Sequence, residues 1–179
     1  MLNRKKYSFY RHSPQYPNLF RKEAARLRKL LPEAVIEHVG STSVPKLSGK
    51  GIIDISIGVL RKDIPKTHRK LQQKGYIYTG LGGSHDRIFL YRIIRYAGKE
   101  RRVHVHLVTH NSTTWKKSMA VRDYLRNYPL AAQAYAAVKK KAVQHAKGEG
   151  ERYRAYKKCF LDQLEKKALK EYTIQIKKK

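Results

Sequence analysis

Apolar residues in the first third of the chain recur first at helical spacing and then at strand spacing. Residues 19–31 contain an apolar stripe with the helical period, which predicts an amphipathic helix. The stripe consists of Phe20, Ala24, Leu27 and Leu31. Pro32 ends this helix because it lacks a backbone donor and restricts the residue before it. Residues 34–39 (AVIEHV) and 51–59 (GIIDISIGV) predict two strands, and the strongly apolar second one is typical of a central strand.

The rest of the chain shows two further strand patterns and a helical C-terminal part. A helix is expected over residues 64–74, and Gly75 ends it. Residues 86–94 and 101–108 predict strands, the second with clear alternation. Three helices are expected from Thr114 onward. The apolar stripe of the third helix comprises Tyr153, Tyr156, Phe160, Leu164 and Ala168. The pattern predicts an α+β fold: a mixed β-sheet with flanking helices and a C-terminal helical segment.

The length of 179 residues suits one domain with a hydrophobic core. We expect an N-terminal extension over residues 1–15, one domain over 16–169 and a basic tail over 170–179. The domain divides into a sheet part at about 33–110 and a helical part at 114–169. The final IKKK is expected to be disordered.

The net charge of the chain indicates which classes of partner it can attract. The chain has 41 Lys and Arg residues against 13 Asp and Glu residues, a formal net charge of +28. Such a charge attracts polyanions, so nucleic acid, nucleotides, phosphorylated metabolites and anionic membranes are all admissible partners. The alternative is a solvated surface that reflects an organism-wide lysine bias.

The cysteine content and the hydropathy of the chain exclude several kinds of site and several classes of protein. Cys159 is the only cysteine, which excludes an intrachain disulfide and a cysteine-based zinc site. Its helical context predicts a small, reduced core residue. No apolar run approaches the roughly 18 residues that span a bilayer, and the basic start lacks the apolar stretch of a signal peptide. We therefore expect a soluble cytoplasmic protein with no membrane among its partners, although its charge alone would admit an anionic membrane surface.

Polar side chains interrupt two of the predicted strands. Because strand side chains alternate between faces, Asp54 and Ser56 share the face away from the neighbouring isoleucines. In the later strand, His104 and His106 share one face with Arg102. If the two strands are neighbours, Asp54, Ser56 and the two histidines line one site. An unpaired buried carboxylate is costly, so Asp54 needs a metal, a cationic partner or water. The alternative is that both polar faces simply meet water.

The turn before the second strand has the sequence GSTS. Gly40, Ser41, Thr42 and Ser43 offer three hydroxyls and several backbone N–H groups. Such a turn suits phosphate oxygens, particularly where a helix begins at Thr42 or Ser43. Hydroxyl residues are also ordinary helix caps, so the turn alone does not identify a site.

Taken together, these motifs resemble the GrpB family, within the nucleotidyltransferase fold of DNA polymerase beta and its relatives. The resemblance runs from about Tyr16 to Ala168. It rests on IEHVGSTSVPKLSGKGIIDISIGV, DRIFLY, HVHLV, VRDYLRNYP, AYAAVKKKA and RYRAYKKCFLDQL, in this order.

The resemblance implies a role for each matching residue. Gly40 and Ser41 match the phosphate-facing turn, and Asp54 matches the first metal-holding acid. Ser56 stands at the position of the second acid, while His104 and His106 lie on the strand of the third. Further matches are the basic Arg87, the helical motif of Arg122, Asp123 and Tyr124, and the helix residues Lys139 and Lys157.

The chain also departs from the family pattern. Ser56 supplies no carboxylate, so Asp54 is the only acid for a mechanism that shares carboxylates between two metals. Imidazoles favour zinc, manganese or iron over magnesium. Lys46 stands where the family usually has Gly, and Gly51 where it usually has Pro.

The leading hypothesis is a nucleotidyltransferase-fold protein that binds a nucleotide or another phosphorylated ligand, with nucleotidyl transfer left open. A divalent metal, Mg²⁺ or Mn²⁺, would be held by Asp54 with His104 or His106, and a nucleoside triphosphate would be the substrate. Lys50, Arg87 and Arg122 would neutralise phosphate charge. Trp115 and Tyr124 are candidates for stacking on a base, or are core residues.

Two alternatives remain. One is a noncatalytic module that binds RNA or nucleotides, since residues 87–122 hold nine Lys and Arg residues and one acid, Glu100. The other is a metabolic enzyme for coenzyme A-type phosphorylated substrates, because several members of the family are fused to dephospho-CoA kinase.

Overall fold

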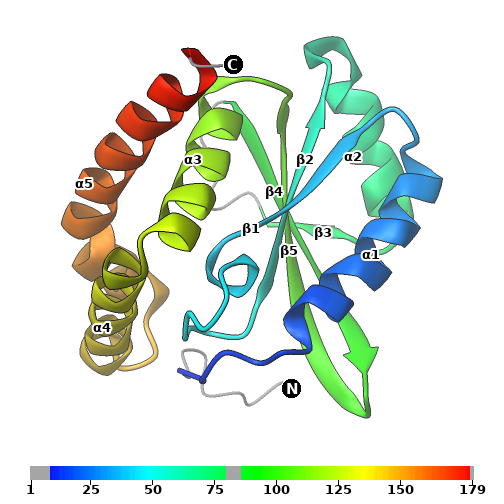
Figure 1. Ribbon diagram of the computed structural model, residues 1–179. Helices are drawn as coiled ribbons and strands as arrows, with labels where there is room; N and C mark the ends of the chain where they lie inside the picture. The colour runs from blue at the N-terminus through cyan, green and yellow to red at the C-terminus, as the bar shows by residue number, and fades with distance from the viewer. Residues whose placement is uncertain (1–8, 80–85, 178–179) are drawn as a thin grey trace.

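The computed structural model describes residues 9–79 and 86–177, and it contains one five-stranded sheet (Figure 1). The strands lie in the order β1-β2-β5-β4-β3. Their bounds are β1 Val35–Val39, β2 Ile53–Val59, β3 Ile77–Tyr78, β4 Arg87–Tyr96 and β5 Lys99–Thr109. β2 and β5 run parallel, and the other neighbours are antiparallel. The predicted α+β class and the mixed sheet are confirmed.

Helices cover both faces of the sheet. α1 (Tyr16–Leu30) and α2 (Ile64–Gln73) pack on one face, and α3 (Thr113–Asn127), α4 (Pro129–Ala146) and α5 (Gly150–Lys177) lie on the other side (Figure 1). Two short 3₁₀ turns, η1 (Ser41–Ser43) and η2 (Arg61–Asp63), complete the elements in the described ranges. None of the helices described is both long and apolar enough to cross a membrane.

The sequence pattern predicted the main elements but missed three features. β3 is a two-residue strand, too short to show a period. α5 continues to Lys177, so the expectation of disorder is wrong for residues 176–177, whereas residues 178–179 lie outside the described residues. Cys159 is exposed rather than in the core, because it lies off the buried stripe of α5. Tyr156, predicted on that stripe, is 41% exposed for the same reason.

The connection between the η1 turn and β2 follows an unusual path. Lys46 has φ 62°, and Gly51 has φ +70°. Both values lie in the left-handed region that glycine adopts without strain. Proline fixes φ near −65°, so Gly51 sets a local backbone that a proline could not follow. Tyr10 pairs with Gly49 in this connection through backbone bonds of 2.7 and 3.0 Å, which fixes the described part of the N-terminal extension.

Candidate functional site

The centre of the site is Asp54 on β2. Parallel pairing places Asp54 opposite His104 and Ser56 opposite His106 on β5, as the face pattern predicted. Asp54 Oδ1 lies 3.1 Å from His104 Nδ1 and 3.6 Å from His106 Nε2. The Asp54 side chain is 23% exposed and the two imidazoles are 18% and 20% exposed. One carboxylate and two imidazoles therefore meet in a half-buried cluster.

Asp54 and His104 shape each other's protonation. Burial opposes the charge on Asp54, but hydrogen bonds from both imidazoles outweigh it and hold the pKa of this carboxyl well below its usual range. Burial lowers the pKa of His104 even though Asp54 favours its charged form. Because a carboxylate only accepts hydrogen bonds, a neutral His104 places its proton on Nδ1 toward Asp54. Its Nε2 then has an available lone pair.

The glycine of the η1 turn packs directly against Asp54. Gly40 has φ +69°, and a Cβ built on it would lie 2.3 Å from Asp54 Oδ2. Two of the turn's three hydroxyls have internal partners. Ser43 Oγ donates to the Gly40 carbonyl at 2.6 Å, and Thr42 Oγ1 donates to the Ile52 carbonyl at 3.0 Å. The turn is a single 3₁₀ turn, not the start of a longer helix, so it adds no helix dipole.

Lys139 approaches the turn from α4. It is only 3% exposed, and its Nζ donates to the Ser48 carbonyl at 2.6 Å. The Nζ also lies 3.2 Å from a Cβ built on Gly49, and Ser41 Oγ lies 2.6 Å from the same point. Burial and the charge of Lys157 lower the pKa of Lys139 to about 7, against an opposing contribution from Asp54. Lys139 is thus a buried ammonium beside the Ser41 hydroxyl.

Two further lysines complete a basic cluster. Lys50 precedes β2, and burial lowers its pKa to about 8, with Asp54 opposing and Lys157 adding to the shift. Its Nζ lies 4.6 Å from the centroid of the Tyr153 ring, and Lys157 Nζ lies 5.1 Å from the same ring. A loop, α4 and α5 therefore each bring one lysine to the surroundings of Asp54.

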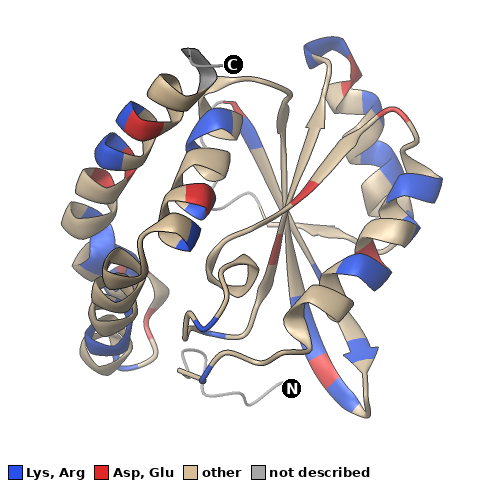
Figure 2. Ribbon diagram, viewed as in Figure 1, with Lys and Arg blue, Asp and Glu red and all other residues tan. Residues whose placement is uncertain are grey.

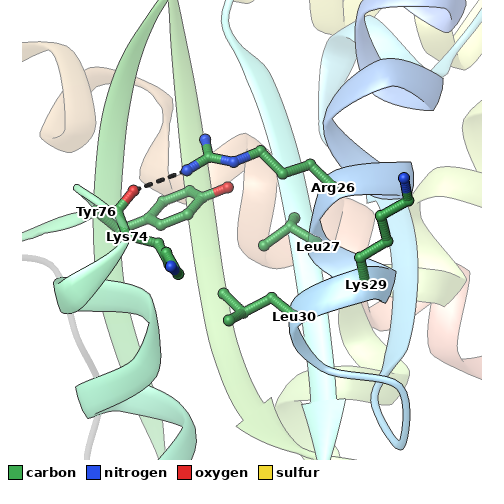
Figure 3. A pocket seen from close by; sticks show the side chains of 6 residues that line it. All are labelled: Arg26, Leu27, Lys29, Leu30, Lys74 and Tyr76. Atoms are coloured by element: carbon green, nitrogen blue, oxygen red, sulfur yellow. Dashed lines mark hydrogen bonds between the residues drawn. The ribbon is translucent and has the colours of Figure 1, made fainter.

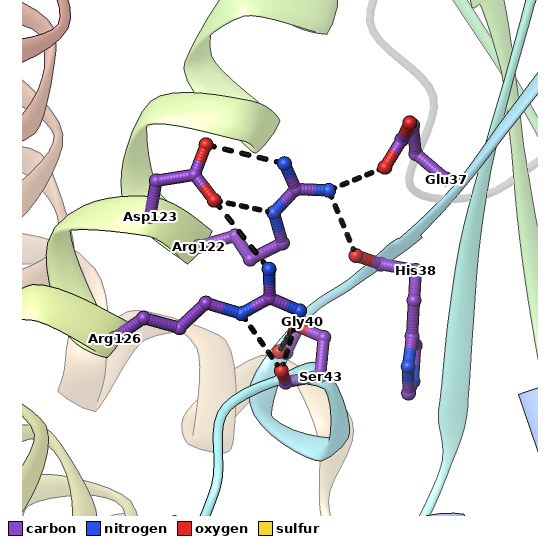
Figure 4. Close-up of polar contacts among 7 residues, drawn as sticks. All are labelled: Glu37, His38, Gly40, Ser43, Arg122, Asp123 and Arg126. Carbon is purple, nitrogen blue, oxygen red and sulfur yellow. Dashed lines mark hydrogen bonds and ion pairs between the residues drawn. The ribbon is translucent and has the colours of Figure 1, made fainter. Parts of the chain in front are cut away.

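Arg122 and Arg126 hold α3 against β1 and the turn (Figure 4). Arg122 donates to Glu37 at 2.6 Å and to the two carboxylate oxygens of Asp123 at 2.7 and 3.1 Å. Arg126 donates to the Ser43 carbonyl at 3.1 and 2.9 Å. The carboxylates of Glu37 and Asp123 thus occupy the Arg122 guanidinium, which was predicted to contact phosphate. Asp123, another predicted site residue, is therefore paired with Arg122.

The remaining predicted residues lie around this centre. Trp115 is 4% exposed in an apolar cluster with Val39, Val108 and Met119, so the idea that it stacks on a base is wrong. Tyr124 is half-buried, and its ring centroid is 4.4 Å from that of Tyr128. Arg87 is half-buried at the start of β4, opposite Val108.

Sequence reasoning missed two residues that shape the site. Phe89 lies opposite His106, and its ring centroid is 4.9 Å from that of His104 and 5.3 Å from that of His106. Its place two residues after Arg87 put it on the site face, which was a usable signal. Arg126, which fixes the turn, gave no such signal because its partner is a backbone carbonyl 83 residues away.

The donor set does not match the magnesium site that the fold implies. In residues 9–79 and 86–177, no three His, Cys, Asp or Glu side chains are arranged to hold one metal ion. Glu37, the other carboxylate on this face, is paired with Arg122. Ser56 Oγ and His106 Nδ1 are buried, with no hydrogen-bond partner among the described residues. Metal binding by Asp54, His104 and His106 therefore remains a prediction.

A cavity of about 380 Å³ lies away from this site, between α1 and the segment that follows α2 (Figure 3). It is lined by Arg26, Leu27, Lys29, Leu30, Lys74 and Tyr76. Arg26 Nη2 donates to the Lys74 carbonyl at 3.0 Å, and Tyr76 donates to Glu23. None of the residues predicted for the Asp54 site lines this cavity.

Two solved structures resemble the fold of this chain. The chain is 31% identical to the conserved protein GrpB from Enterococcus faecalis, with a TM-score of 0.78 over 92% of this chain and 99% of that one. A cytoplasmic RNA terminal U-transferase has a TM-score of 0.53 at 13% identity, over 76% of this chain and 44% of that one. The second likeness shows the nucleotidyltransferase fold alone.

Sequence relatives define the family. The chain is 31% identical to a UPF0157 protein of Halalkalibacterium halodurans over 88% of this chain and 80% of that protein. It is 32% identical to UPF0157 protein YqkA of Bacillus subtilis over 75% of this chain, but spans only 39% of that protein. The family model described as GrpB protein matches residues 7–167. The chain therefore belongs to the GrpB family and has the nucleotidyltransferase fold.

Proposed function

We propose that this protein binds a nucleotide or another phosphorylated ligand beside Asp54, with the phosphates held by Lys50, Lys139 and Lys157. The observation behind the proposal is that Lys50 and Lys139, from two separate elements, both interact with the charge of Asp54, while Lys157 of α5 lies close enough to repel both lysines. Lys139 also lies beside Ser41 of the Gly-Ser turn. A cluster with more ammonium groups than carboxylates favours an anion.

The protonation of the lysines supports an anionic ligand. Burial and the charge of Lys157 lower the pKa values of Lys50 and Lys139 to about 8 and about 7. A bound phosphate would offset that repulsion and accept their hydrogen bonds, as charge-assisted pairs do. Ser41 Oγ lies beside Lys139 and is the turn hydroxyl best placed to join them.

The proposal covers binding and not transfer. A nucleotidyl transfer that uses two metals needs shared carboxylates, and among the described residues Asp54 is the only carboxylate paired with His104 and His106. The fold neighbour named an RNA terminal U-transferase suggests a nucleoside triphosphate as the first ligand to try.

The test is calorimetry with ATP, GTP, CTP and UTP, each in EDTA and in Mn²⁺ or Mg²⁺. We expect binding by at least one nucleotide, weakened about tenfold or more in Lys50→Met because one charge-assisted contact is worth roughly 1.5–3 kcal/mol. Lys66→Met, which removes an exposed lysine of α2, is the matched control. No binding at millimolar concentration, or equal weakening in both variants, would refute the proposal.

Asp54→Asn in the same experiment shows whether a metal takes part. Without metal, the substitution removes a negative charge beside the phosphates and should tighten binding. If Asp54 holds a cation for the nucleotide, the same substitution should weaken binding in Mn²⁺. His104→Ala and His106→Ala then identify which imidazole is a ligand, since only the loss of a ligand changes the preferred metal.

A further inference from the structure

β4 and β5 extend beyond the rest of the sheet as a two-stranded ribbon. β2 pairs with β5 only from Val103 onward, and β3 pairs with β4 only at Leu90 and Tyr91. Residues 92–102, here called the basic ribbon, therefore pair only with each other, apart from Arg92, which lies opposite Val103. They form the projecting end of the β4–β5 hairpin (Figure 1). One face of the ribbon contacts α1, where Arg92 pairs with Glu23 and Lys22 lies over Tyr96. The other face continues the face of Asp54.

The basic ribbon carries an excess of positive charge. It contains one acid, Glu100, and five basic residues: Arg92, Arg95, Lys99, Arg101 and Arg102. Figure 2 shows this concentration of Lys and Arg on the projecting hairpin. Apart from Arg92, none of the five forms an ion pair with a carboxylate in the described part of the chain. The Nε atoms of Arg101 and Arg102 are buried and have no hydrogen-bond partner there.

A row of arginine and aromatic side chains joins the basic ribbon to the site. The Arg102 guanidinium lies 4.0 Å from the centroid of the Tyr91 ring, and Tyr91 lies opposite His104. Phe89 continues the row against both imidazoles. Arg102 also contributes to the lowered pKa of Lys50, so the ribbon and the lysine cluster share one electrostatic field.

We propose that the basic ribbon binds single-stranded nucleic acid and leads one end of the strand to the Asp54 site. Unneutralised arginines supply backbone contacts, and arginine–aromatic pairs supply flat surfaces on which bases stack whatever their sequence. Each base stacked on an aromatic ring contributes roughly 1–3 kcal/mol, and this surface is available only to unpaired bases. The part of this proposal in which one end of the strand reaches Asp54 rests on the function proposed above, whereas binding of the strand to the ribbon does not.

The test is fluorescence anisotropy with a labelled oligouridylate and, separately, a duplex of equal charge, over a range of salt concentrations. The double variant Arg95→Glu with Lys99→Glu changes two exposed residues at the ribbon tip. The matched control is Arg69→Glu with Lys66→Glu, which makes the same charge change on exposed positions of α2, on the other face of the sheet. All four positions are exposed, so both double variants should fold.

We expect the wild type to prefer the single strand and the ribbon variant to lose about tenfold or more in affinity. The salt slope should fall by about 0.7 for each phosphate contact removed, while the control stays within about threefold of wild type. Equal loss in both variants would overturn the proposal, as would no binding or a preference for the duplex. Calorimetry of the ribbon variant with a mononucleotide separates the two proposals. If the proposed nucleotide site is wrong but the ribbon proposal is right, no mononucleotide binds, yet oligouridylate binding still depends on the ribbon.

Discussion

The two faces of the central sheet are built from alternate residues of the same strands, yet they are organised differently. On the α1 and α2 face, Ile53, Ile55 and Ile57 are fully buried in one continuous apolar cluster with Leu27 and Leu71. On the α3–α5 face, the apolar residues form separate smaller clusters. The polar centre of Asp54, His104 and His106 lies on this second face.

This difference indicates that the α1 and α2 face contributes most of the stability, whereas the α3–α5 face carries the residues proposed for ligand binding. Apolar burial is non-directional and needs only area, so the first face is mainly apolar, and its buried Glu23 is paired with Tyr76 and Arg92. The second face keeps Ser56 Oγ and His106 Nδ1 buried without partners among the described residues, which is a cost to folding. Such a cost is expected where a ligand supplies the missing hydrogen bonds.

The largest expected effect contrasts neighbouring residues of β2. Ile55→Ala should lower the free energy of unfolding by about 3–4 kcal/mol, because it leaves a cavity in the continuous cluster. Ser56→Ala should change it by less than about 1 kcal/mol, because the hydroxyl that it removes has no partner. Urea denaturation of the two variants measures both. Similar losses would show that the faces share the work of folding.

A smaller effect is expected at the turn that covers Asp54. Gly40→Ala places a methyl group against Asp54 Oδ2 at a φ of +69°. Gly98→Ala, in the β4–β5 turn, has nearly the same φ of +73° with nothing within 4 Å, so it measures backbone strain alone. We expect about 1 kcal/mol from strain at Gly98 and at least twice that at Gly40. Equal values would mean that the turn moves away from Asp54 at no cost.

The site face of each strand could be predicted from the sequence, because strand alternation is local. Asp54 and the two histidines were placed together by period alone, once their strands were taken as neighbours. Lys139 and Lys157 were predicted only through the family resemblance and not from any period, since their approach to the site depends on how α4 and α5 dock. Cys159 illustrates the same limit: its helix was predicted, but the side of the helix that meets the core was misjudged.

The smallest expected effect concerns the pH dependence of stability. The pKa of Lys139 is about 7 in the folded protein and 10.5 ordinarily, so between these values the unfolded chain binds more protons. Stability therefore rises with pH in this window, and the part due to Lys139 is lost as pH falls through about 7. One group contributes at most about 1.4 kcal/mol per pH unit.

Lys139→Met should remove this contribution. The increase in the free energy of unfolding from pH 7.5 to pH 8.5, measured by urea denaturation, should therefore be about 1 kcal/mol smaller in the variant than in the wild type. Lys50, whose pKa is about 8, keeps its own share of the rise in both proteins. The exposed Lys66→Met should behave like wild type because its ammonium stays in water. If Lys139→Met leaves the pH dependence unchanged, Lys139 is protonated at neutral pH without cost. The basic cluster would then be neutralised within the protein, and the contrast between the two faces would rest on Asp54 and its histidines alone.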